Sequence, residues 1–532
     1  MERYTLPTQQ NSVPAVTRTV ALGMFDGLHS GHRAVIAAAL RGVSRCAVYT
    51  FDPATVTTKP GNCRLMETEE LCARLEKLGV QDIFTADFAA VKDMTPARFV
   101  TEILVELLHA DSVVCGFNYR FGAGGVGDTD TLTTLCAAQG ITVTVVPPTT
   151  VEGETVSSTA IRQALADGDM AKARRMLSNA YGLCLPVIEG QHLGRRLGMP
   201  TINQVLPPHR MLPRFGVYAS AVEIGNQVYH GVTNIGRRPT VGTDTPLAET
   251  WIDGFEGDVY GQTVTVYPVK FLRSEQTFPS LEALQAQVKA DAAEARALFA
   301  PTGRVRAVLF DFDDTLHIRD DAFRRALTGL VNKYYPSDTD DERQRIVEEM
   351  FAKNRHGYGM GCSFREFLTP FLPNDTTDIA EFLHYFFIRY ADSCILQPDV
   401  SATLDILRQQ GIRPGVITNG GSLVQNGKVD MTGLRPLLDI VAVGGDETVQ
   451  KPDPLLFRRV AARLGVACED CVYVGDHPVN DIAGARSAGM RAVFIEYGRP
   501  ADHPCHQYPL PPDIPVIHAI GQLPAVLETL NT

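Results

Sequence analysis

A short apolar run in the second half of the sequence ends in a group of acidic residues. Ala307–Phe310 is followed by Asp311-Phe312-Asp313-Asp314-Thr315. Side chains of an extended segment alternate between its two sides, so Asp311 and Asp313 can face one metal ion and one phosphate together. Open α/β sheets place their sites at the carboxyl ends of strands. The segment therefore predicts a site for phosphate chemistry at the end of a buried strand.

Two histidines near the N-terminus form a second candidate site. The segment from Gly23 to His32 reads Gly-Met-Phe-Asp-Gly-Leu-His-Ser-Gly-His and lies between an apolar run and a helical stretch. His29 and His32 would therefore lie at a helix N-terminus, where backbone N–H groups and the helix dipole favour phosphate. Such a pair could stabilise the charge that develops on an α-phosphate during nucleotidyl transfer. The alternative interpretation is a turn with two solvated histidines.

Two later segments of the same region have a composition suited to holding phosphate. Gly116-Phe117-Asn118-Tyr119-Arg120-Phe121-Gly122 follows an apolar run. Ser157-Ser158-Thr159-Ala160-Ile161-Arg162 opens a helical stretch with hydroxyls and a guanidinium. Hydroxyls at a helix start and a nearby arginine are typical phosphate ligands. Both segments favour nucleotide binding by this region.

A third candidate site is a basic segment with several glycines, from Gly190 to Asn203. It contains Gly194 and Arg195 and ends in Thr201-Ile202-Asn203. Glycines let backbone amides approach phosphates closely, and hydroxyl and amide oxygens are suitable Mg²⁺ ligands. The alternative is a basic, glycine-rich loop of a small barrel.

Two further patterns carry less weight. Gly122-Ala123-Gly124-Gly125-Val126-Gly127 satisfies G-x-G-x-x-G, but no convincing helix pattern follows it, so we interpret it as a loop rather than a dinucleotide site. Cys468 and Cys471 form a Cys-x-x-Cys pair without a second pair or a nearby histidine. We interpret them as two thiols that precede a buried strand, because a structural zinc site needs four ligands.

The elements that must position these residues change in character along the chain. Apolar runs alternate with helical stretches from Thr19 to about Ala180, which predicts a parallel sheet with flanking helices, with strands at Val20–Gly23, Ala47–Phe51, Val113–Cys115 and Thr142–Val146. Short β-rich runs at Gly216–Ile224, Val228–Ile235 and Thr263–Phe271 then predict a small antiparallel barrel. Ser280–Phe299 reads as one helix, and Pro301-Thr302-Gly303 as a linker. After it, Ala307–Phe310 opens a second alternation of strands and helices, with additional helices expected at Ala322–Tyr335, Asp341–Arg355 and Asp378–Ser393.

Composition excludes several classes of protein. Apolar residues are 45% and charged residues 21% of the 532, which is typical of globular domains and argues against disorder. The net charge of −12 argues against a nucleic-acid or acidic-membrane partner, since either would need a basic surface. We see no run of about 18 apolar residues and no signal peptide. The eleven cysteines are irregularly spaced, which favours reduced thiols and a cytoplasmic location.

The first two regions resemble the bacterial bifunctional riboflavin kinase/FMN adenylyltransferase (FAD synthetase) family. The carrying motifs are the histidine segment, Ser157–Arg162, Gly231–Thr240, Glu249-Thr250-Trp251-Ile252, Asp258–Gly261 and Leu272-Arg273-Ser274-Glu275 with Phe278. The resemblance implies riboflavin, FMN and ATP as substrates and FMN and FAD as product ligands. It implies Glu249 as the general base for the ribityl 5′-hydroxyl, Thr201 and Asn203 as holders of MgATP, and His29 and His32 as catalytic groups. It implies ATP or phosphate contacts at Gly23, Phe25, Asp26, Gly31, Asn118, Ser157, Thr159, Arg162, Gly190, Gly194 and Arg195, and flavin contacts at Arg273, Glu275 and Phe278.

One departure from that family pattern concerns the segment after the second strand. The family usually carries Phe-x-Pro-His-Pro, whereas this chain has Phe51-Asp52-Pro53-Ala54-Thr55. The missing histidine would lie near the nucleotide, so adenylyl transfer could be slower or altered.

The last region resembles the haloacid dehalogenase-like superfamily. Four pieces occur in its order: Asp311–Leu316, Val416–Gly420, Gln450–Pro454 and Val474–Asp481. The resemblance implies Asp311 as the nucleophile that forms an aspartyl phosphate and Asp313 as general acid and then base. It implies phosphoryl contacts from Thr418, Asn419 and Lys451. The Mg²⁺ ligands would be Asp311, the Asp313 carbonyl and Asp476, with Asp481 supporting the metal or Lys451. An aspartate at position 313 favours a phosphatase over a dehalogenase, because a leaving alkoxide needs a proton.

Together these resemblances predict three domains in one enzyme. Residues 1–181 would be a Rossmann-like α/β nucleotidyltransferase, 182–300 an antiparallel β-barrel kinase, and 301–532 an α/β phosphatase with a helical cap over about 317–398. The chain would convert riboflavin to FMN and FMN to FAD, with a fused Mg²⁺-dependent phosphatase that acts on a small phosphomonoester of the flavin pathway. Two alternatives stay open: a chain with a weakened or lost adenylyltransferase, and a non-catalytic flavin or nucleotide sensor. The sensor predicts loss of catalytic charges, yet Glu249, Asp311, Asp313 and Lys451 are present. The oligomeric state is left open.

Overall fold

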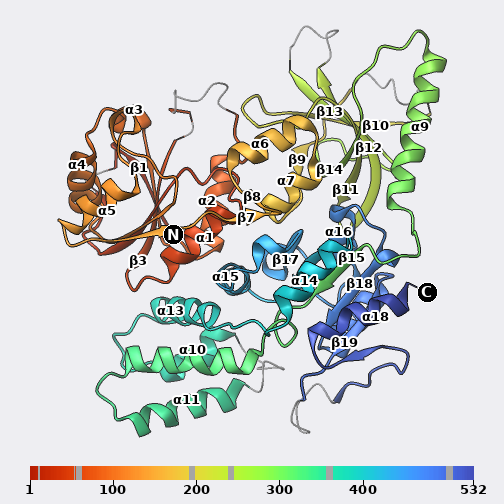
Figure 1. Ribbon diagram of the computed structural model, residues 1–532. Coiled ribbons are helices and arrows are strands. Elements are labelled where there is room, and N and C mark those ends of the chain that lie inside the picture. Colours follow the sequence, from red (N-terminus) through yellow and green to blue (C-terminus); the bar gives the residue numbers. More distant parts are fainter. Residues whose placement is uncertain are drawn as a thin grey trace.

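The computed structural model describes residues 1–9, 12–52, 54–55, 63–190, 198–237, 245–354, 363–498 and 507–531. Gly194 and Arg195, two of the predicted phosphate contacts, lie outside these ranges. Three sheets of six strands each follow one another along the chain (Figure 1). Among the described helices, none is both long enough and apolar enough to cross a membrane.

The first domain is a parallel sheet with helices on both faces, in the strand order β1-β4-β3-β2-β5-β6. Its strands are β1 (Glu2–Leu6), β2 (Arg18–Leu22), β3 (Arg45–Phe51), β4 (Asp82–Ala86), β5 (Ala110–Gly116) and β6 (Thr142–Val146). Its helices are α1 (Ser30–Leu40), α2 (Thr68–Lys77), α3 (Phe88–Val91), α4 (Pro96–Arg98), the π-helix η2 (Phe99–Leu107), α5 (Thr129–Ala137), α6 (Ser158–Asp167) and α7 (Met170–Leu177), with a small hairpin of β7 (Thr150–Val151) and β8 (Glu154–Thr155). The central strands β2, β3, β4 and β5 are largely buried on both faces, which explains their continuous apolar runs.

The second domain is an antiparallel barrel in the order β10-β13-β12-β11-β14-β9. Its strands are β9 (Leu183–Pro186), β10 (Thr201–Val205), β11 (Gly216–Ile224), β12 (Gln227–Arg237), β13 (Pro246–Ile252) and β14 (Thr263–Arg273). A bridge between Ile188, just after β9, and Asn203 of β10 brings the two edges together, which nearly closes the barrel. Helix α9 (Leu281–Phe299) begins at the capping residue Ser280 and packs along β11 and β12.

The third domain is a second parallel sheet, in the order β17-β16-β15-β18-β19-β20. Its strands are β15 (Ala307–Phe310), β16 (Arg413–Thr418), β17 (Ile440–Val443), β18 (Cys471–Gly475), β19 (Arg491–Ile495) and β20 (Val516–Ile517). The sheet is flanked by α14 (Val400–Gln409), α15 (Ser422–Met431), α16 (Pro454–Leu464), η10 (Pro478–Ala483), α17 (Gly484–Ser487) and α18 (Leu523–Leu530). Between β15 and α14 the chain forms a helical cap of α10 (Arg319–Tyr334), α11 (Asp340–Asn354), α12 (Phe364–Leu368) and α13 (Ile379–Asp392).

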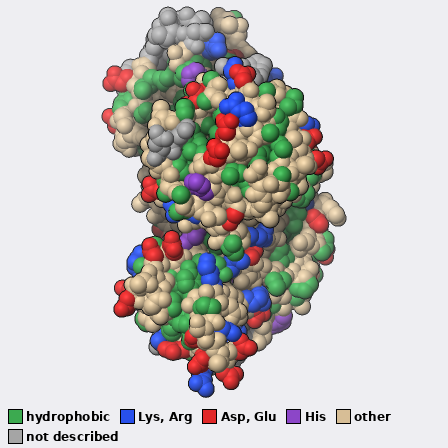
Figure 2. Space-filling view, turned by 90° about the vertical axis from the view of Figure 1, so that its left-hand side faces the viewer, with side chains coloured by type: hydrophobic (Ala, Val, Ile, Leu, Met, Phe, Trp, Pro, Cys, Tyr) green, Lys and Arg blue, Asp and Glu red, His purple; other side chains and the backbone are tan. Residues whose placement is uncertain are grey.

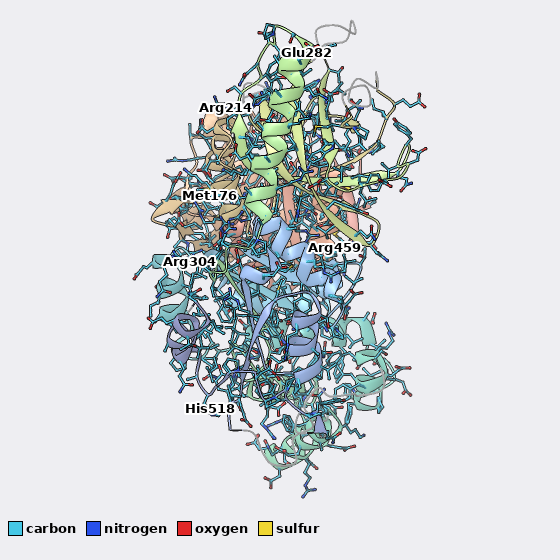
Figure 3. The ribbon with its side chains drawn as sticks, turned by 90° about the vertical axis from the view of Figure 1, so that its right-hand side faces the viewer. Met176, Arg214, Glu282, Arg304, Arg459 and His518 are labelled. Carbon is cyan, nitrogen blue, oxygen red and sulfur yellow. The ribbon has the colours of Figure 1, made fainter. Side chains whose placement is uncertain are left out.

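Buried polar contacts join the third domain to the other two. Arg174 of α7 pairs with Asp439 (Nη2–Oδ1 3.1 Å), and both side chains are about 5% exposed or less. Arg463 of α16 pairs with Glu223 of the barrel strand β11 (Nε–Oε1 2.7 Å). Figure 3 shows Arg459, on the same helix, where the barrel meets the third domain. The expected linker is also fixed, because the backbone N–H of Thr302 donates to the buried carboxylate of Asp470.

The surface carries both signs of charge close together. On the face shown in Figure 2, Lys and Arg side chains are interspersed with Asp and Glu. The sequence likewise contains similar numbers of both kinds, with 49 basic and 61 acidic residues.

Candidate active sites

The histidine segment of the first domain lies at the N-terminus of α1, at the carboxyl end of β2. His29 is the N-cap residue, and its Nδ1 accepts a hydrogen bond from the His32 backbone N–H (3.2 Å). The two imidazole rings stack with centroids 3.6 Å apart. The pKa of His29 is lowered to about 4, mainly by burial, with a smaller contribution from the charge of Arg162. His29 is therefore neutral at pH 7.

A cavity of about 800 Å³ opens beside the two histidines. Eight of the residues predicted to contact nucleotide line it: Gly23, Phe25, His29, Gly31, His32, Asn118, Ser157 and Thr159. Its other side is aromatic, formed by Tyr49, Phe51, Phe88, Phe99, Tyr119 and Phe121. One polar end and one aromatic side suit a ligand with phosphates and a flat ring system.

Asp26 and Arg162 were also predicted to contact nucleotide. Their contacts join the segments that surround this cavity. Their side chains form an ion pair, and Asp26 accepts hydrogen bonds from the backbone N–H groups of Leu65 (2.9 Å) and Met66 (3.2 Å). The hydroxyl of Ser158 donates to the Asp26 carbonyl (2.9 Å). These contacts connect the start of α6 to the loop before α1, so both phosphate-holding segments lie at one cavity.

The segment that departs from the family pattern has a local structural role. The Thr55 hydroxyl accepts a hydrogen bond from the backbone N–H of Phe88 (2.9 Å), at the first residue of α3. Thr55 therefore supports a helix whose Phe88 lines the cavity. The glycine-rich segment Gly122–Gly127 forms a loop, with positive φ at Gly122, Gly124 and Gly125. The structure differs from the expectation in that α5 begins soon after this loop, at Thr129, capped by Asp128.

In the second domain, the predicted base and metal-holding residues meet on one face of the barrel. Asn203 of β10 lies opposite Glu249 of β13, and Glu249 lies opposite Asn234 of β12. Residues directly opposite each other share a face of the sheet, and Thr201 is on the same face two positions before Asn203. Gly190 packs against this row, since a Cβ atom there would lie 2.3 Å from the Asn203 Nδ2. The arrangement places a carboxylate beside hydroxyl and amide groups and beside a closely approaching backbone.

The three predicted flavin contacts lie at the end of β14 and in the segment that follows it. Arg273 forms a double ion pair with Asp291 of α9 (Nε–Oδ1 3.0 Å, Nη2–Oδ2 2.7 Å). Its guanidinium is 5.7 Å from the ring centroid of Phe278. Glu275 lies over Gly236 of β12, where a Cβ atom would meet its carboxylate at 1.9 Å. The structure therefore brings Arg273 and Phe278 together and places Glu275 against β12, but it directs the guanidinium of Arg273 towards α9.

In the third domain, the carboxyl ends of three neighbouring strands meet. Asp311 follows β15, Thr418 ends β16 and Asp476 follows β18. Lys451, in the loop before α16, pairs with Asp311 (Nζ–Oδ1 2.7 Å) and Asp481 (Nζ–Oδ1 2.7 Å). Asn419 connects the two loops, because its Nδ2 donates to the Lys451 carbonyl and its Oδ1 accepts from the Lys451 N–H, both at 2.8 Å. The predicted residues thus form one buried polar site.

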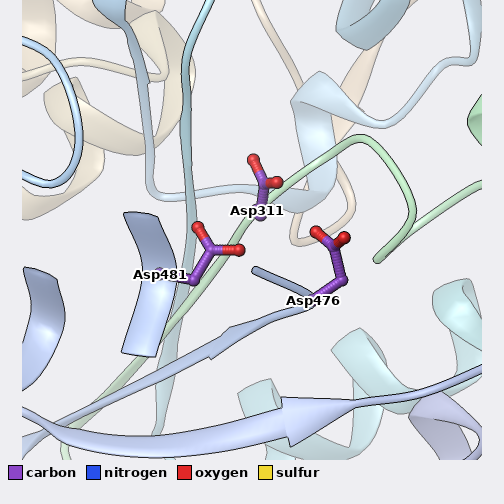
Figure 4. Close-up of side chains that lie close together, drawn as sticks. All are labelled: Asp311, Asp476 and Asp481. Atoms are coloured by element: carbon purple, nitrogen blue, oxygen red, sulfur yellow. The ribbon is translucent and has the colours of Figure 1, made fainter. Parts of the chain in front are cut away.

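Asp311, Asp476 and Asp481 form a set that can hold a metal ion (Figure 4). Each offers a carboxylate oxygen, and these oxygens lie within 4.8 Å of one another. All three residues are buried. Burial raises the pKa of Asp311 to about 7, with Lys451 opposing the shift and the charge of Asp481 adding to it. A divalent cation would neutralise this excess of buried negative charge, so the donor set fits Mg²⁺.

Asp313 lies in a different environment from Asp311. Its Oδ1 accepts from Lys428 Nζ (2.6 Å) and interacts with His317 Nε2 (2.7 Å), and its Oδ2 accepts from Gln425 Nε2 (2.8 Å). Burial opposes ionisation, but the charges of Lys428 and His317 hold the pKa of Asp313 well below its usual range. Lys428, Gln425 and His317 were missed from the sequence. Their only signal in the sequence was their position. His317 directly follows Asp311–Leu316, and Gln425 and Lys428 follow Val416–Gly420.

Comparison with known proteins identifies all three domains. Family models match FAD synthetase over residues 13–160, riboflavin kinase over 177–299 and haloacid dehalogenase-like hydrolase over 305–489. The bifunctional riboflavin kinase/FMN adenylyltransferase of Pseudomonas fluorescens is 38% identical over 293 residues, which are 93% of that protein and 53% of this chain. The Escherichia coli (strain K12) protein of the same name is 34% identical over 300 residues, with the same coverage.

The chain belongs to the bifunctional riboflavin kinase/FMN adenylyltransferase family. It phosphorylates riboflavin to FMN and adenylylates FMN to FAD, and it carries a haloacid dehalogenase-like hydrolase domain as a third unit. Kinases and adenylyltransferases of these families generally use ATP and Mg²⁺, and hydrolases of the third family generally use Mg²⁺. One solved structure similar to the hydrolase domain is a HAD phosphatase from Thermococcus onnurineus, with 28% identity, coverage of 42% of this chain and 98% of that one, and a TM-score of 0.31.

Adenylyltransferase residues that the sequence did not single out also line the cavity. Lys92 and Thr149 belong to its wall, together with the aromatic side described above. Lys92 follows the short helix α3, and Thr149 precedes β7. Neither has a motif in the sequence, because each reaches the cavity only through the packing of its element.

Proposed function

We propose that the residues brought together in the two flavin domains carry the roles that the family pattern implies. Glu249 would accept the proton of the riboflavin 5′-hydroxyl, and Thr201 and Asn203 would hold MgATP beside it. The row Asn203–Glu249–Asn234 on one face of the barrel supports this assignment. His29 and His32 would contact the ATP phosphates at the start of α1, which is supported by their stacking at the polar end of the cavity. Arg273, Glu275 and Phe278 would contact the flavin.

For the hydrolase domain we propose a phosphatase that works through an aspartyl phosphate. Asp311 would attack phosphorus while Lys451 and Thr418 bind the phosphoryl oxygens, and Asp313 would transfer the proton to and from the leaving group. Asp311, the Asp313 carbonyl, Asp476 and Asp481 would hold Mg²⁺, whose charge lets a carboxylate approach an anionic phosphate. The meeting of these groups at three adjacent strand ends supports the proposal.

We further propose that this phosphatase serves the flavin pathway. The supporting observation is that the hydrolase domain is joined to both flavin domains by ion pairs, the buried pair Arg174–Asp439 and the largely buried pair Arg463–Glu223. Hydrolysis of FMN would oppose the kinase and consume one ATP per cycle. The ribitylamino-pyrimidine phosphate upstream of riboflavin has the same ribityl 5′-phosphate and a smaller ring. We propose this compound as the substrate, with the helical cap selecting the one-ring head group.

Phosphate release from the two candidate substrates tests this proposal. We expect the full-length protein, with Mg²⁺ and without ATP, to show a kcat/KM for the pyrimidine phosphate at least about tenfold above that for FMN, or roughly 1.4 kcal/mol. Omitting ATP silences the kinase and the adenylyltransferase, and the Asp311→Asn variant is the blank for contaminating phosphatases. Equal rates, or a preference for FMN, would contradict the substrate assignment.

A further inference from the structure

Helix α15 of the hydrolase domain lies between the helical cap and the adenylyltransferase domain. It begins two residues after Gly420, at the end of the phosphate-binding segment that follows β16. On one side it packs against α13 of the cap, and on another against α1, the helix that carries His32 (Figure 1). Its residues can therefore contact both the phosphatase site and the first domain.

One side of α15 holds the carboxylate of Asp313. Gln425 and Lys428 are three positions apart, so they project from neighbouring points of the helix surface. Lys428 reaches Asp313 Oδ1 at 2.6 Å and Gln425 reaches Asp313 Oδ2 at 2.8 Å, so each carboxylate oxygen has its own donor on this helix. Gln425 also donates to the carbonyl of Asn419 (2.6 Å), which ties Asp313 to the phosphate-binding segment. The Lys428 side chain is 1% exposed, so its charge is directed entirely inward.

Another side of α15 is bound by an arginine of the adenylyltransferase domain. Arg33, the residue after His32, donates from Nε to Asp430 Oδ2 (3.0 Å) and from Nη2 to Asn426 Oδ1 (2.7 Å). Asn426 and Asp430 are four positions apart and lie one above the other on the helix. The Arg33 and Asp430 side chains are 11% and 5% exposed, so this contact is shielded from solvent.

We propose that Lys428 and Gln425 are positioning residues for Asp313, and that Arg33 holds the helix that carries them. The phosphatase site is then completed by the adenylyltransferase domain. This inference rests on the acid–base role of Asp313 proposed above. A group that gives a proton to a leaving oxygen must stay within hydrogen-bond reach of it, and a displacement of about 1 Å can cost about 10²-fold in rate.

A purely structural role does not explain this arrangement well. A buried ion pair gives little net stability, and apolar residues of the same volume usually serve as well. Lys428 and Gln425 instead fix both oxygens of the one carboxylate that faces the leaving group in the proposed mechanism. Positioning predicts a loss of activity that depends on how much the leaving group needs a proton.

Two substrates with different leaving groups separate these roles in the full-length protein with Mg²⁺. An alkyl phosphomonoester needs proton transfer to its alkoxide, whereas 2,4-dinitrophenyl phosphate releases a stable anion. The reference variant Asp313→Asn should lower kcat for the alkyl ester by about 10²–10⁴-fold and for the aryl ester far less. Lys428→Met should lower kcat for the alkyl ester by at least about tenfold and for the aryl ester by less than about threefold. Gln425→Leu should show the same selectivity.

Arg33→Met extends the test to the first domain and removes no group from the phosphatase site. It should lower kcat for the alkyl ester by about three- to tenfold and leave the aryl ester near wild type, if a small shift of α15 displaces Asp313. The matched control is Lys77→Met on α2. This variant also removes an ion pair between the first and third domains, from Lys77 Nζ to Asp446 Oδ1 (3.3 Å). This control should retain wild-type rates on both esters.

Three results would overturn the inference. The first is that Lys428→Met and Arg33→Met lower kcat equally for the alkyl and the aryl ester. The second is that both variants hydrolyse the alkyl ester at the wild-type rate. The third is an additive loss in the double variant Lys428→Met/Asp313→Asn, because a residue that acts through Asp313 has no further effect once Asp313 is replaced. If Asp313→Asn itself shows no dependence on the leaving group, then the proposed role of Asp313 fails first, and the inference with it.

Discussion

The reactive side chains of the two flavin sites differ in chemical type and lie in separate parts of the sequence. Glu249 is a half-buried carboxylate in a row with Asn203 and Asn234, whereas His29 and His32 are stacked imidazoles at a helix N-terminus. A carboxylate can take a proton from an alcohol, and imidazoles at a helix start can bind phosphate. The two steps should therefore be separable by single substitutions.

Glu249→Gln should abolish riboflavin phosphorylation and leave FMN adenylylation near wild type. The amide keeps the size of the side chain but cannot accept the proton, and general-base loss costs about 10²–10⁴-fold. Chromatography of riboflavin, FMN and FAD over time measures both steps. His32→Ala is the matched variant and should give the opposite pattern, with FMN accumulating and no FAD. Loss of both steps in a folded variant would contradict the assignment.

Stabilisation by Mg²⁺ should depend on pH through Asp311. Its pKa is raised to about 7 in the folded chain, whereas an unfolded aspartate ionises near 4, so the metal-free fold loses stability as the pH rises between these values. Mg²⁺ binds the ionised form and offsets this loss. The rise in thermal midpoint on adding Mg²⁺ should be larger at about pH 7.5 than at about pH 5.5. In Asp311→Asn the rise on adding Mg²⁺ should be nearly the same at both pH values. If the wild type also shows the same rise at both pH values, this prediction is contradicted.

At the scale of elements, one tight turn of the first domain fits against two helices of the third. Gly79 lies between α2 and β4 with φ +97°, and a Cβ atom there would be 2.2 Å from Leu423 of α15 and 3.4 Å from His384 of α13. Only glycine combines this conformation with this close approach. Burial lowers the pKa of His384 to about 4, and the charge of Arg45 contributes. The cap helix therefore docks with a neutral histidine.

Acidification should weaken this docking. A histidine whose folded pKa lies below its unfolded value of about 6.5 takes up protons on unfolding, so its contribution is complete above that pH and is lost as the pH falls towards 4. The thermal midpoint should fall between about pH 6.5 and pH 4.5, and His384→Gln should reduce this slope. The exposed His518 (Figure 3) offers the matched substitution His518→Gln for comparison. An identical slope in wild type and His384→Gln would exclude this role.

At the scale of the whole molecule, the three domains pack against one another and are not joined by linkers alone. Arg174 and Asp439 are both buried, and Ser178 nearby accepts a hydrogen bond at its carbonyl from the Val441 N–H (3.0 Å), which adds a backbone contact between the domains. The hydrolase domain therefore depends on the flavin domains for part of its buried surface.

Removing one member of this pair should destabilise the hydrolase domain strongly. Arg174→Leu leaves Asp439 buried without its partner, which costs about 3–5 kcal/mol. The double variant Arg174→Leu/Asp439→Leu should recover most of that loss, because no uncompensated charge remains. Urea unfolding of the full chain measures both, with Arg41→Met as the control: its exposed pair with Asp392 should contribute about 0–1 kcal/mol. A small effect of Arg174→Leu would show that the domains are only loosely associated.

Much of the architecture could be predicted because strong local signals encode it. The strands Thr142–Val146, Gly216–Ile224 and Ala307–Phe310 have the bounds that the apolar patterns indicated. The edge strands β1, β9 and β10 were missed, since each is short and gains its hydrogen bonds only from a distant partner. Similarly, the acidic, hydroxyl and lysine segments of the last third occur in the order of the haloacid dehalogenase-like superfamily, and this resemblance predicted the hydrolase domain. The segments meet in the fold because the carboxyl ends of adjacent parallel strands lie at one edge of the sheet.

The sequence by itself determined which reactive side chains follow which strands. Its resemblance to known families predicted the two flavin activities and the hydrolase domain. The partners of those side chains depend on the tertiary structure. Lys428 and Gln425 lie more than 110 residues from Asp313 along the chain, and Arg33 lies almost 400 residues from Asp430. Local periodicity carries no information on contacts at such separations, because they arise only when helices of different domains pack together. Only the folded chain therefore shows that α15 contacts the phosphatase site and the adenylyltransferase domain at once.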